Sequence, residues 1–507
     1  MARPNFVLIM TDTQGANIIG TYGHPELETP NIDGLAKTGI KFTRAYTTCP
    51  LCTPARAGLF TGIYAHTSGP WTNNLPLGDN IQTMGQRFQD NGYRTAFVGK
   101  WHLDGHDYFG TGICPAGWED EYWYDGKRYL DELTQAEITL WRSGLGSIEK
   151  LREHDIRPEF TWAHRVSDRA IRFLEDQSEE PFVLVVSYDE PHGPFTCPLE
   201  YAEKFADYGY PIGPAAYDAL EGKPAHQKEW AASTNRQLYD ACLRHPLYFG
   251  CNSFVDSEIG RVIDAAHELA PEDTYLIFTS DHGDMIGAHG LMGKGPVMYQ
   301  EITWMPLLIE QPKHAGAGTV NTTTVSHIDL LPTMLELARL DLPPILEGTS
   351  LVPQLQGIED PDKSAVIEFQ RYEIEHDSWG GFQPVRCIVQ GPHKLVINLL
   401  HSDELYDLDR DPAENENLIE HPAFIELRDT LHDRLLDWMY EKRDPFRGPV
   451  WERRPWRETR RLQWKGKFRP RPADGYAPEV RDYDTGLPTV GVKVEFEARG
   501  KAPEDTE

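Results

Sequence analysis

The sequence contains little cysteine, few basic residues and no long apolar run. Its 507 residues include 7 cysteines without a repeated spacing, which does not fit a small disulfide-stabilised scaffold and favours a reducing compartment. Lys and Arg number 49 against 79 Asp and Glu, a formal charge of −30, which argues against a general nucleic-acid-binding protein. The apolar stretch Phe6–Met10 is too short for a signal-peptide core or a membrane span. We therefore expect a cytoplasmic protein that binds neither nucleic acid nor membranes.

Aromatic residues are plentiful, with 13 Trp, 22 Tyr and 20 Phe, so the chain can bury a large core. Short continuous apolar runs alternate with helical patterns as far as Leu340. This alternation predicts an α/β fold whose mixed, mostly parallel sheet is sandwiched by helices. The predicted strands are Phe6–Met10, Thr95–Val98, Phe182–Ser187, Tyr275–Thr279 and Pro306–Ile309, and the predicted helices are Asn31–Lys37, Thr83–Asp90, Asp168–Asp176, Phe254–Leu269 and Ile328–Leu340.

A second region begins near Ser364. Two short β-like runs, Val385–Val389 and Lys394–Leu399, are joined by Gly391-Pro392, which is typical of a hairpin connection. A strong helical pattern follows over His421–Lys442. We therefore expect an α/β domain over residues 1–363 and a smaller α+β subdomain over residues 364–445.

The remaining residues, 446–507, form a tail of different composition. Between Arg447 and Arg471 there are ten Lys or Arg and two acidic residues, with several prolines and with Trp451, Trp456 and Trp464. This composition predicts an extended segment. A basic, aromatic strip can bind a polyanion, such as a sulfated glycan or RNA, or it can pack on an acidic neighbour. We favour packing on another subunit, which predicts a homo-oligomer.

Ionisable side chains follow four of the predicted strands. Because the carboxyl ends of parallel strands meet at one edge of a sheet, these side chains are expected to share a crevice. Any one of them alone is as easily a helix cap, a turn residue or a solvated group. Carboxylate and imidazole donors suit Ca²⁺, Mg²⁺ or Mn²⁺, whereas a thiolate zinc site is not indicated. These residues are Asp12, Lys100, His102, Asp104, His192, Asp281 and His282, with Lys294 a little further along the chain.

The segment from residue 49 to residue 62 has two interpretations. Cys49 and Cys52 form a C-x-x-C pair, which suggests thioredoxin-like chemistry or half of a metal site, but no second C-x-x-C follows. The other interpretation begins at Cys52 and takes Cys-x-Pro-x-Arg as far as Arg56, followed by Leu59 and Thr61-Gly62. This pattern resembles the signature of the sulfatase family, in which the cysteine is oxidised to a formylglycine.

The resemblance extends over several other motifs in the family's order. It covers roughly residues 4–440, and it is specific because spaced motifs agree together. The motifs are the N-terminal strand ending in Asp12, T-P-N-I-D-x-L-A at Thr29–Ala36, G-K-W-H-L at Gly99–Leu103, P-H-x-P-F at Pro191–Phe195, S-D-H-G at Ser280–Gly283, Lys294, E-L-Y-D-L from Glu404 and the segment Asp411–Leu418.

The resemblance implies an alkaline phosphatase-like fold, a divalent metal ion and a formylglycine at position 52 that a formylglycine-generating enzyme makes. The hydrated aldehyde would attack the sulfur of a small sulfated substrate, and the sulfate would then leave. The implied metal ligands are Asp12, Cys52, Asp281 and His282. Arg56 would hold the modified side chain, Lys100 and Lys294 would grip the sulfate, His102 would take the proton of the second hydroxyl, and His192 would protonate the leaving oxygen.

Two positions depart from the common family pattern. Thr13 stands where many members have a second carboxylate, and His282 stands where many have asparagine. The loss of one carboxylate is expected to weaken Ca²⁺ binding relative to Mg²⁺ or Mn²⁺, and Thr13 or Gln14 could supply an oxygen instead. The pair Asp281-His282 also resembles phosphonate monoester hydrolases and some carbohydrate or choline sulfatases.

We therefore expect a sulfuric ester hydrolase acting on a sulfate monoester, with carbohydrate sulfates preferred. The alternative enzyme is a phosphonate monoester or phosphodiester hydrolase on the same fold. A thiol oxidoreductase using Cys49 and Cys52, and a catalytically silent polyanion-binding protein, are the hypotheses from other classes. Weaker candidates for substrate contacts are Asn73, Asn74, Asp104, His106, Arg371, His376 and Asp377.

Overall fold

The computed structural model describes residues 3–142, 145–176, 180–234, 241–372 and 381–460. Its main sheet has the strand order β10-β2-β8-β7-β1-β4-β3, with β9 beside β2. Strand β8 is antiparallel to both of its neighbours, and the other strands are parallel to one another. The predicted mixed, mostly parallel sheet is therefore confirmed. The strands are β1 (Asn5–Thr11), β2 (Ile40–Tyr46), β3 (Arg94–Gly99), β4 (Phe182–Ser187), β7 (Thr274–Ser280), β8 (Trp304–Glu310), β9 (Thr319–Asn321) and β10 (Val325–Ser326).

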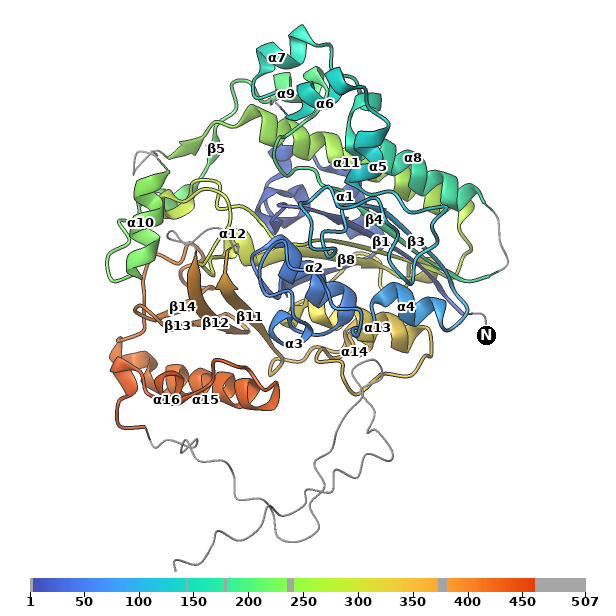
Figure 1. Cartoon of the computed structure of the whole chain (residues 1–507). Helices are drawn as coiled ribbons and strands as arrows, with labels where there is room; N and C mark the ends of the chain where they lie inside the picture. The colour runs from blue at the N-terminus through green and yellow to red at the C-terminus, as the bar shows by residue number, and fades with distance from the viewer. Residues whose placement is uncertain (1–2, 143–144, 177–179, 235–240, 373–380, 461–507) are drawn as a thin grey trace, which may run out of the picture.

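Helices cover both faces of this sheet (Figure 1). Because side chains alternate along a strand, Val7 and Ile9 of β1 enter one apolar core, and Phe6, Leu8 and Met10 enter the other. The first core lies under α1 (Pro30–Thr38), α8 (Trp162–Glu175) and α11 (Pro246–Leu269). The second lies under α2 (Cys52–Thr61), α4 (Met84–Gln89), α13 (Leu330–Leu337) and α14 (Val352–Leu355), with α3 (Ala65–Ser68) beside α2. Continuous apolar runs were thus the correct signal for strands buried on both faces.

Two helices begin earlier than their apolar patterns predicted. Helix α8 starts six residues before Asp168, where the side chain of Thr161 accepts a hydrogen bond from the His164 amide. Helix α11 starts at Pro246 instead of Phe254, and the ring of His245 accepts from the Tyr248 amide. In both helices the capping residue and the first turn precede the apolar repeat from which the helix was predicted, so the repeat places the start of the helix too late. Within the described residues, no helix is both long and apolar enough to cross a membrane.

Strand β2 was missed by the sequence analysis. Its sequence, I-K-F-T-R-A-Y, alternates apolar and polar residues instead of forming the continuous run that marked the other strands. The strand lies towards one side of the sheet, between β8 and the short strands β9 and β10. Its carboxyl end leads directly to α2, so this strand places Cys52 at the same edge as the ends of β1, β3, β4 and β7.

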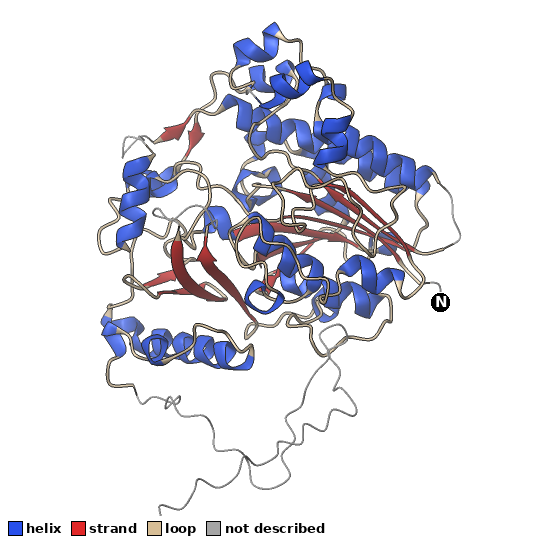
Figure 2. Ribbon diagram, in the orientation of Figure 1, coloured by secondary structure: helices blue, strands red, loops and turns tan. Residues whose placement is uncertain are grey.

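The C-terminal region forms a separate antiparallel sheet, seen beside the main sheet in Figure 2. One face packs on the body of the molecule, and α15 (Ile425–Glu441) covers the other. The predicted smaller α+β part is confirmed. Its strands are β11 (Ser364–Arg371), β12 (Phe382–Gln390), β13 (His393–Asn398) and β14 (Glu404–Asp407). Shorter elements elsewhere are α5 (Gly126–Asp131), α6 (Gln135–Arg142), α7 (Ile148–Glu153), α9 (Leu199–Lys204), α10 (Ala225–Ser233), α12 (Gln300–Thr303), β5 (Tyr210–Pro211) and β6 (Cys242–Leu243).

The start of the tail is not extended as predicted. Residues 449–452 form the short helix α16 (Pro449–Glu452), and a 3₁₀ turn follows over Pro455–Arg457. Basic residues of this segment meet acidic partners in their own chain: Arg454 Nε lies 2.7 Å from Asp403, and Arg457 Nη1 lies 2.9 Å from Asp433. For these two arginines an acidic neighbour lies in the same chain, whereas packing of the tail on another subunit stays a prediction. The remainder of the tail, including Trp464, lies outside the described residues, and the homo-oligomer stays a prediction.

Gly99, the last residue of β3, fixes the path of the chain into the site. Its φ of +112° is a conformation that other residues rarely adopt, and an added Cβ would lie 1.8 Å from the Ser187 carbonyl oxygen. We expect Gly99→Ala to lower the free energy of unfolding by about 3 kcal/mol or more, measured by chemical denaturation. Gly34→Ala in α1 is the matched control, because a Cβ there meets no atom within 4 Å and should stabilise the helix by about 0.5–1 kcal/mol. Equal losses in the two variants would contradict this account.

Candidate active site

The site lies at the edge where the parallel strands of the main sheet end. Asp12 follows β1, Asp281 follows β7 and Lys100 follows β3, and these strands lie in register with β4 between β1 and β3. Helix α2 begins at Cys52, with an extended Leu51 before it, and all ten residues of α2 are buried. The side chain of Asn73 caps this helix, since its Oδ1 accepts from the Thr53 amide at 3.0 Å. The structure thus brings these strand ends to one edge of the sheet, as the sequence predicted.

Four potential metal ligands converge here. One donor atom each from Asp12, Cys52, Asp281 and His282 lies within 4.8 Å of the others, and all four residues are buried. Cys52 Sγ is 3.1 Å from His282 Nε2 and 3.7 Å from Asp12 Oδ1. His282 Nδ1 lies 2.9 Å from the Gly283 carbonyl oxygen, so it carries the hydrogen and leaves the Nε2 lone pair facing the cluster. Burial also lowers the pKa of His282, which favours the neutral ring that binds metals.

Arg56 holds the two carboxylates of this cluster. Its Nε donates to Asp281 at 2.9 Å and one Nη donates to Asp12 at 3.0 Å, with all three side chains fully buried. The other Nη donates to the Lys100 carbonyl oxygen at 2.5 Å and to Ser187 Oγ at 2.8 Å. A planar guanidinium suits this fork, and its charge offsets the repulsion between two buried carboxylates. Arg56 therefore orients groups from four segments of the chain at once.

Lys100 is shared between two carboxylates. Its Nζ lies 2.8 Å from Asp12 and 2.8 Å from Asp189. Burial alone would raise the pKa of the Asp12 carboxyl, but Lys100 and the other nearby cations hold it well below its usual range. Burial alone would lower the pKa of the Lys100 ammonium group, but Asp12 and Asp189 raise it above its usual value. Asp189 was given no role by the sequence analysis; its signal was its place at the end of β4, beside the P-H-x-P-F motif.

Lys294 reaches the cluster from a loop that follows β7. Its Nζ lies 2.7 Å from Cys52 Sγ and 3.2 Å from His282 Nε2. Asp284 closes this loop, because its Oδ1 accepts from the amides of Ile286 at 2.8 Å and Gly293 at 3.0 Å. An ammonium group is therefore fixed beside position 52, where an anion bound to the cluster would lie.

Two histidines complete the site. His192 Nδ1 lies 2.8 Å from the Gly193 carbonyl oxygen, and its side chain is 22 % exposed. His102 is buried, and its Nε2 lies 3.1 Å from Asn74 Oδ1. Burial first, and then Lys100, lower the pKa of both rings well below the usual histidine range. Both are therefore neutral in this site, which contains several fixed cations.

Comparison with known proteins assigns this constellation to a family. The family model described as Sulfatase matches residues 4–340, and the model described as N-sulphoglucosamine sulphohydrolase, C-terminal, matches residues 287–441. The chain belongs to the sulfatase family. An uncharacterized sulfatase of Escherichia coli, YidJ, is 56% identical over 98% of this chain and 99% of its own length. The choline-sulfatase of Rhizobium meliloti is 28% identical and covers 83% of each chain.

Solved structures show the same fold. The structure of BT4656 in complex with its substrate D-glucosamine-2-N,6-O-disulfate superposes with a TM-score of 0.70 at 23% identity, covering 88% of this chain and 99% of that one. The phosphonate monoester hydrolase of Agrobacterium radiobacter superposes with a TM-score of 0.69 at 24% identity, covering 87% and 96%. Family membership makes this chain a sulfuric ester hydrolase of the alkaline phosphatase superfamily.

Thr13 and Gln14, the two further candidate metal ligands, lie in different surroundings. Thr13 Oγ1 lies 2.7 Å from Asp12 Oδ1, at the border of the cluster. Gln14 is engaged elsewhere, since its Nε2 donates to Asn252 at 2.6 Å and its Oε1 accepts from Thr11. Of the two, Thr13 is therefore the residue positioned to supply an oxygen to the cluster.

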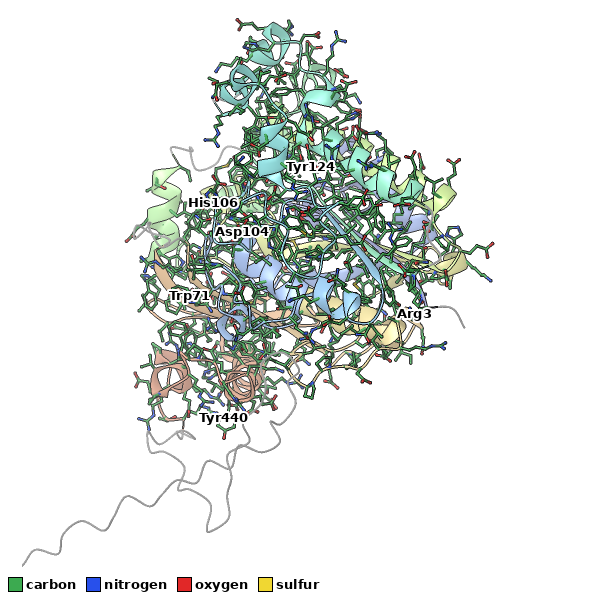
Figure 3. The ribbon with its side chains drawn as sticks, turned by 45° about the vertical axis from the view of Figure 1, so that its right-hand side comes forward. Arg3, Trp71, Asp104, His106, Tyr124 and Tyr440 are labelled. Atoms are coloured by element: carbon green, nitrogen blue, oxygen red, sulfur yellow. The ribbon has the colours of Figure 1, made fainter. Side chains whose placement is uncertain are left out.

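The remaining candidates are Asp104, His106, Arg371, His376 and Asp377. Asp104 Oδ2 accepts from the Thr111 amide at 2.9 Å, so this carboxylate shapes its own loop. His106 is exposed, and Trp71, Asp104 and His106 all lie on the left-hand side in Figure 3. Arg371 ends β11, whereas His376 and Asp377 lie outside the described residues. Neither Asp104 nor His106 contacts the metal-ligand cluster through a described hydrogen bond or ion pair.

Proposed function

We propose that this sulfatase-family chain hydrolyses a sulfate monoester to an alcohol and sulfate, using a formylglycine made from Cys52. A formylglycine-generating enzyme would catalyse the two-electron oxidation of Cys52 by an external oxidant, in which the side-chain carbon becomes the aldehyde and the sulfur leaves. Once oxidised, residue 52 supplies a hydrated aldehyde: one hydroxyl attacks sulfur, and loss of the proton from the other releases sulfate and restores the aldehyde. The observation that carries the proposal is the convergence of Asp12, His282 and Lys294 on Cys52 Sγ.

The donor set of the cluster fits a divalent metal ion. Two carboxylates, one imidazole with a free Nε2 lone pair and the oxygen that would replace the Cys52 sulfur are ligands for Ca²⁺, Mg²⁺ or Mn²⁺. An ion bound there would favour deprotonation of the hydrate and neutralise charge on the sulfate oxygens. With the single carboxylate pair and the Thr13 hydroxyl, we favour Mg²⁺ or Mn²⁺ over Ca²⁺. Arg56 keeps both carboxylates oriented towards the ion.

The surrounding side chains have separate tasks. Lys100 and Lys294 supply positive charge to the sulfate oxygens and to the charge that develops during transfer. His192 protonates the leaving alcohol. Burial, and after it Lys100 and Lys294, lower the pKa of this ring in the free enzyme, and the negative charge of a bound sulfate ester would offset the two lysines. His102 accepts the proton that must be lost when sulfate is released. Each task requires a group within the buried site, where charge interactions are strong.

We favour a small carbohydrate sulfate as substrate and a cytoplasmic location. The solved relative BT4656 holds a sulfated glucosamine, which supports the substrate class at the level of the fold. The phosphonate monoester hydrolase neighbour, and the Asp281-His282 pair, support a phosphonate monoester or phosphodiester as the alternative.

The two substrates are separated by measuring kcat/KM for an aryl sulfate and an aryl phosphonate with one preparation. We expect the sulfate ester to be preferred by at least about a hundredfold. Both substrates are monoanions, but in the phosphonate a carbon substituent replaces one of the oxygens that Lys100 and Lys294 would bind. Mass spectrometry of the peptide that contains residue 52 should show the aldehyde in the same material. A phosphonate preference of several orders of magnitude would replace the proposal by its alternative, and an unmodified Cys52 without turnover would indicate a silent polyanion-binding protein.

A further inference from the structure

We propose that Asn74 is a positioning residue that sets the tautomer of His102 and so makes Nδ1 the atom that accepts a proton. His102 Nε2 forms a hydrogen bond with Asn74 Oδ1, at 3.1 Å. An amide oxygen accepts hydrogen bonds and cannot donate them, so Nε2 carries the hydrogen. In a neutral imidazole the other nitrogen then has the lone pair.

His102 Nδ1 is a buried polar atom that needs a partner. Within the described part of the chain it has no hydrogen-bond partner, although the residue is only 5 % exposed. Leaving such an atom unpaired costs free energy, which points to a group that enters the site. A hydroxyl on the side chain of residue 52 is the group of this chain whose proton has to be removed, under the function proposed above.

The backbone of His102 is bonded to the residue that follows Cys52. The carbonyl oxygen of His102 accepts from Thr53 Oγ1 at 3.1 Å, and Thr53 follows Cys52 at the start of α2. His102 also has a φ of +58°, an uncommon value for a residue other than glycine. This hydrogen bond ties the His102 backbone to the residue that follows Cys52, and the positive φ sets the direction in which the His102 side chain leaves the backbone.

Burial, and after it the charges around His102, lower the pKa of the ring and keep it neutral, and only a neutral ring has two tautomers. Lys100, Arg56 and Lys294 oppose its protonation, and Asp12 is the carboxylate that favours it. Without the Asn74 oxygen, the hydrogen is free to move to Nδ1, where it would block the acceptor. A wrong histidine tautomer causes large losses of activity in triad enzymes, in which a carboxylate orients the histidine as the Asn74 carboxamide orients His102.

The tautomer is measured directly, without reference to activity. Long-range ¹H–¹⁵N correlation spectra of the full-length protein labelled with ¹⁵N-histidine, with His102→Gln to assign the signal, should show a hydrogen on Nε2 and none on Nδ1. Asn74→Leu should remove this pattern, and Asn74→Asp should keep it because a carboxylate oxygen accepts equally. A hydrogen on Nδ1 in the unsubstituted protein, or an unchanged pattern in Asn74→Leu, would overturn the proposal.

The kinetic consequence rests on the proposed function and has its own signature. kcat/KM covers the steps as far as alcohol release, whereas proton transfer to His102 follows in sulfate release. We expect Asn74→Leu to lower kcat roughly tenfold to hundredfold, with KM falling in proportion and kcat/KM unchanged. A general structural disturbance would lower kcat/KM instead and would contradict the assigned role.

The matched control is Asn80→Leu, an exposed asparagine on the same loop for which the described residues contain no hydrogen bond. It should change neither the His102 signal nor kcat, and it should keep the melting temperature of the parent. Asn74→Leu is expected to melt at a somewhat lower temperature, because leucine at the positive φ of Asn74 costs about 1–2 kcal/mol. If the parent protein hydrolyses no sulfate ester, the proposed function fails, but the spectra still decide whether Asn74 sets the tautomer. The two failures are therefore distinguishable.

Discussion

Cys52→Ala is expected to reduce kcat/KM for an aryl sulfate by at least about 10⁴-fold, because it removes the atom from which the nucleophile is made. The substitution leaves the rest of the site in place. Arg56 still joins Asp12 to Asp281, and Lys100 still lies between Asp12 and Asp189. The variant should therefore stay folded, with a melting temperature close to that of the parent.

The matched control for this prediction is Cys49→Ala. Cys49 is also buried and lies three residues earlier in the chain, but Cys52 is the member of the pair that belongs to the ligand cluster. We expect Cys49→Ala to keep nearly all sulfatase activity and to keep the aldehyde at position 52 in the mass spectrum. Activity retained in Cys52→Ala would exclude the formylglycine. An equal loss of activity in both variants would support the C-x-x-C interpretation instead, in which the two thiols act together.

The strand ends could be predicted from the sequence because one rule connects pattern to position. A continuous apolar run predicts a strand buried on both faces, and parallel strands bring the residues after them to one edge. Asp12, Lys100 and Asp281 followed from this rule. Cys52 did not, since β2 alternates apolar and polar residues and was not recognised as part of the sheet. The family resemblance, and not the strand pattern, identified Cys52.

The partners of the site residues could not be predicted from the sequence. Asp189 follows a strand like the others, but nothing in the sequence says that its carboxylate meets Lys100 rather than solvent. Asn74 is only a weak candidate for a substrate contact in the sequence, and its positive φ of 62° agrees with a turn as well as with the contact to His102. Which atoms pair depends on side-chain directions that the tertiary packing determines. The same holds for Arg454 in the tail. The composition of the tail predicts a basic segment, but it does not predict that this guanidinium pairs with Asp403.

Asp281→Asn is expected to remove the metal ion from the protein and most of the activity with it. Asparagine keeps one oxygen that can accept from Arg56 Nε, so the packing of the site is retained, but it lacks the carboxylate charge that a divalent ion needs. Loss of a hydrogen bond that supports a metal ligand lowers metal affinity by about 10- to 100-fold. Because Asp281→Asn changes the ligand itself, we expect metal affinity to fall by at least about a hundredfold. Metal content after dialysis, measured by inductively coupled plasma mass spectrometry in buffers with Ca²⁺, Mg²⁺ and Mn²⁺, tests the affinity and identifies the ion.

Asp284→Asn provides the comparison on the same loop. The Oδ1 of Asp284 accepts two amide hydrogens that close the loop before Lys294, and the Oδ1 of asparagine accepts them equally well. A carboxylate is therefore removed three residues from Asp281 without removing a ligand, and the variant should keep its metal content and its kcat/KM within about threefold. Should Asp284→Asn lose metal as Asp281→Asn does, the general negative charge of the loop would hold the ion. Should Asp281→Asn keep its metal, the ion would be bound away from the cluster at Cys52, and the assignment of Asp281 as a ligand would be wrong.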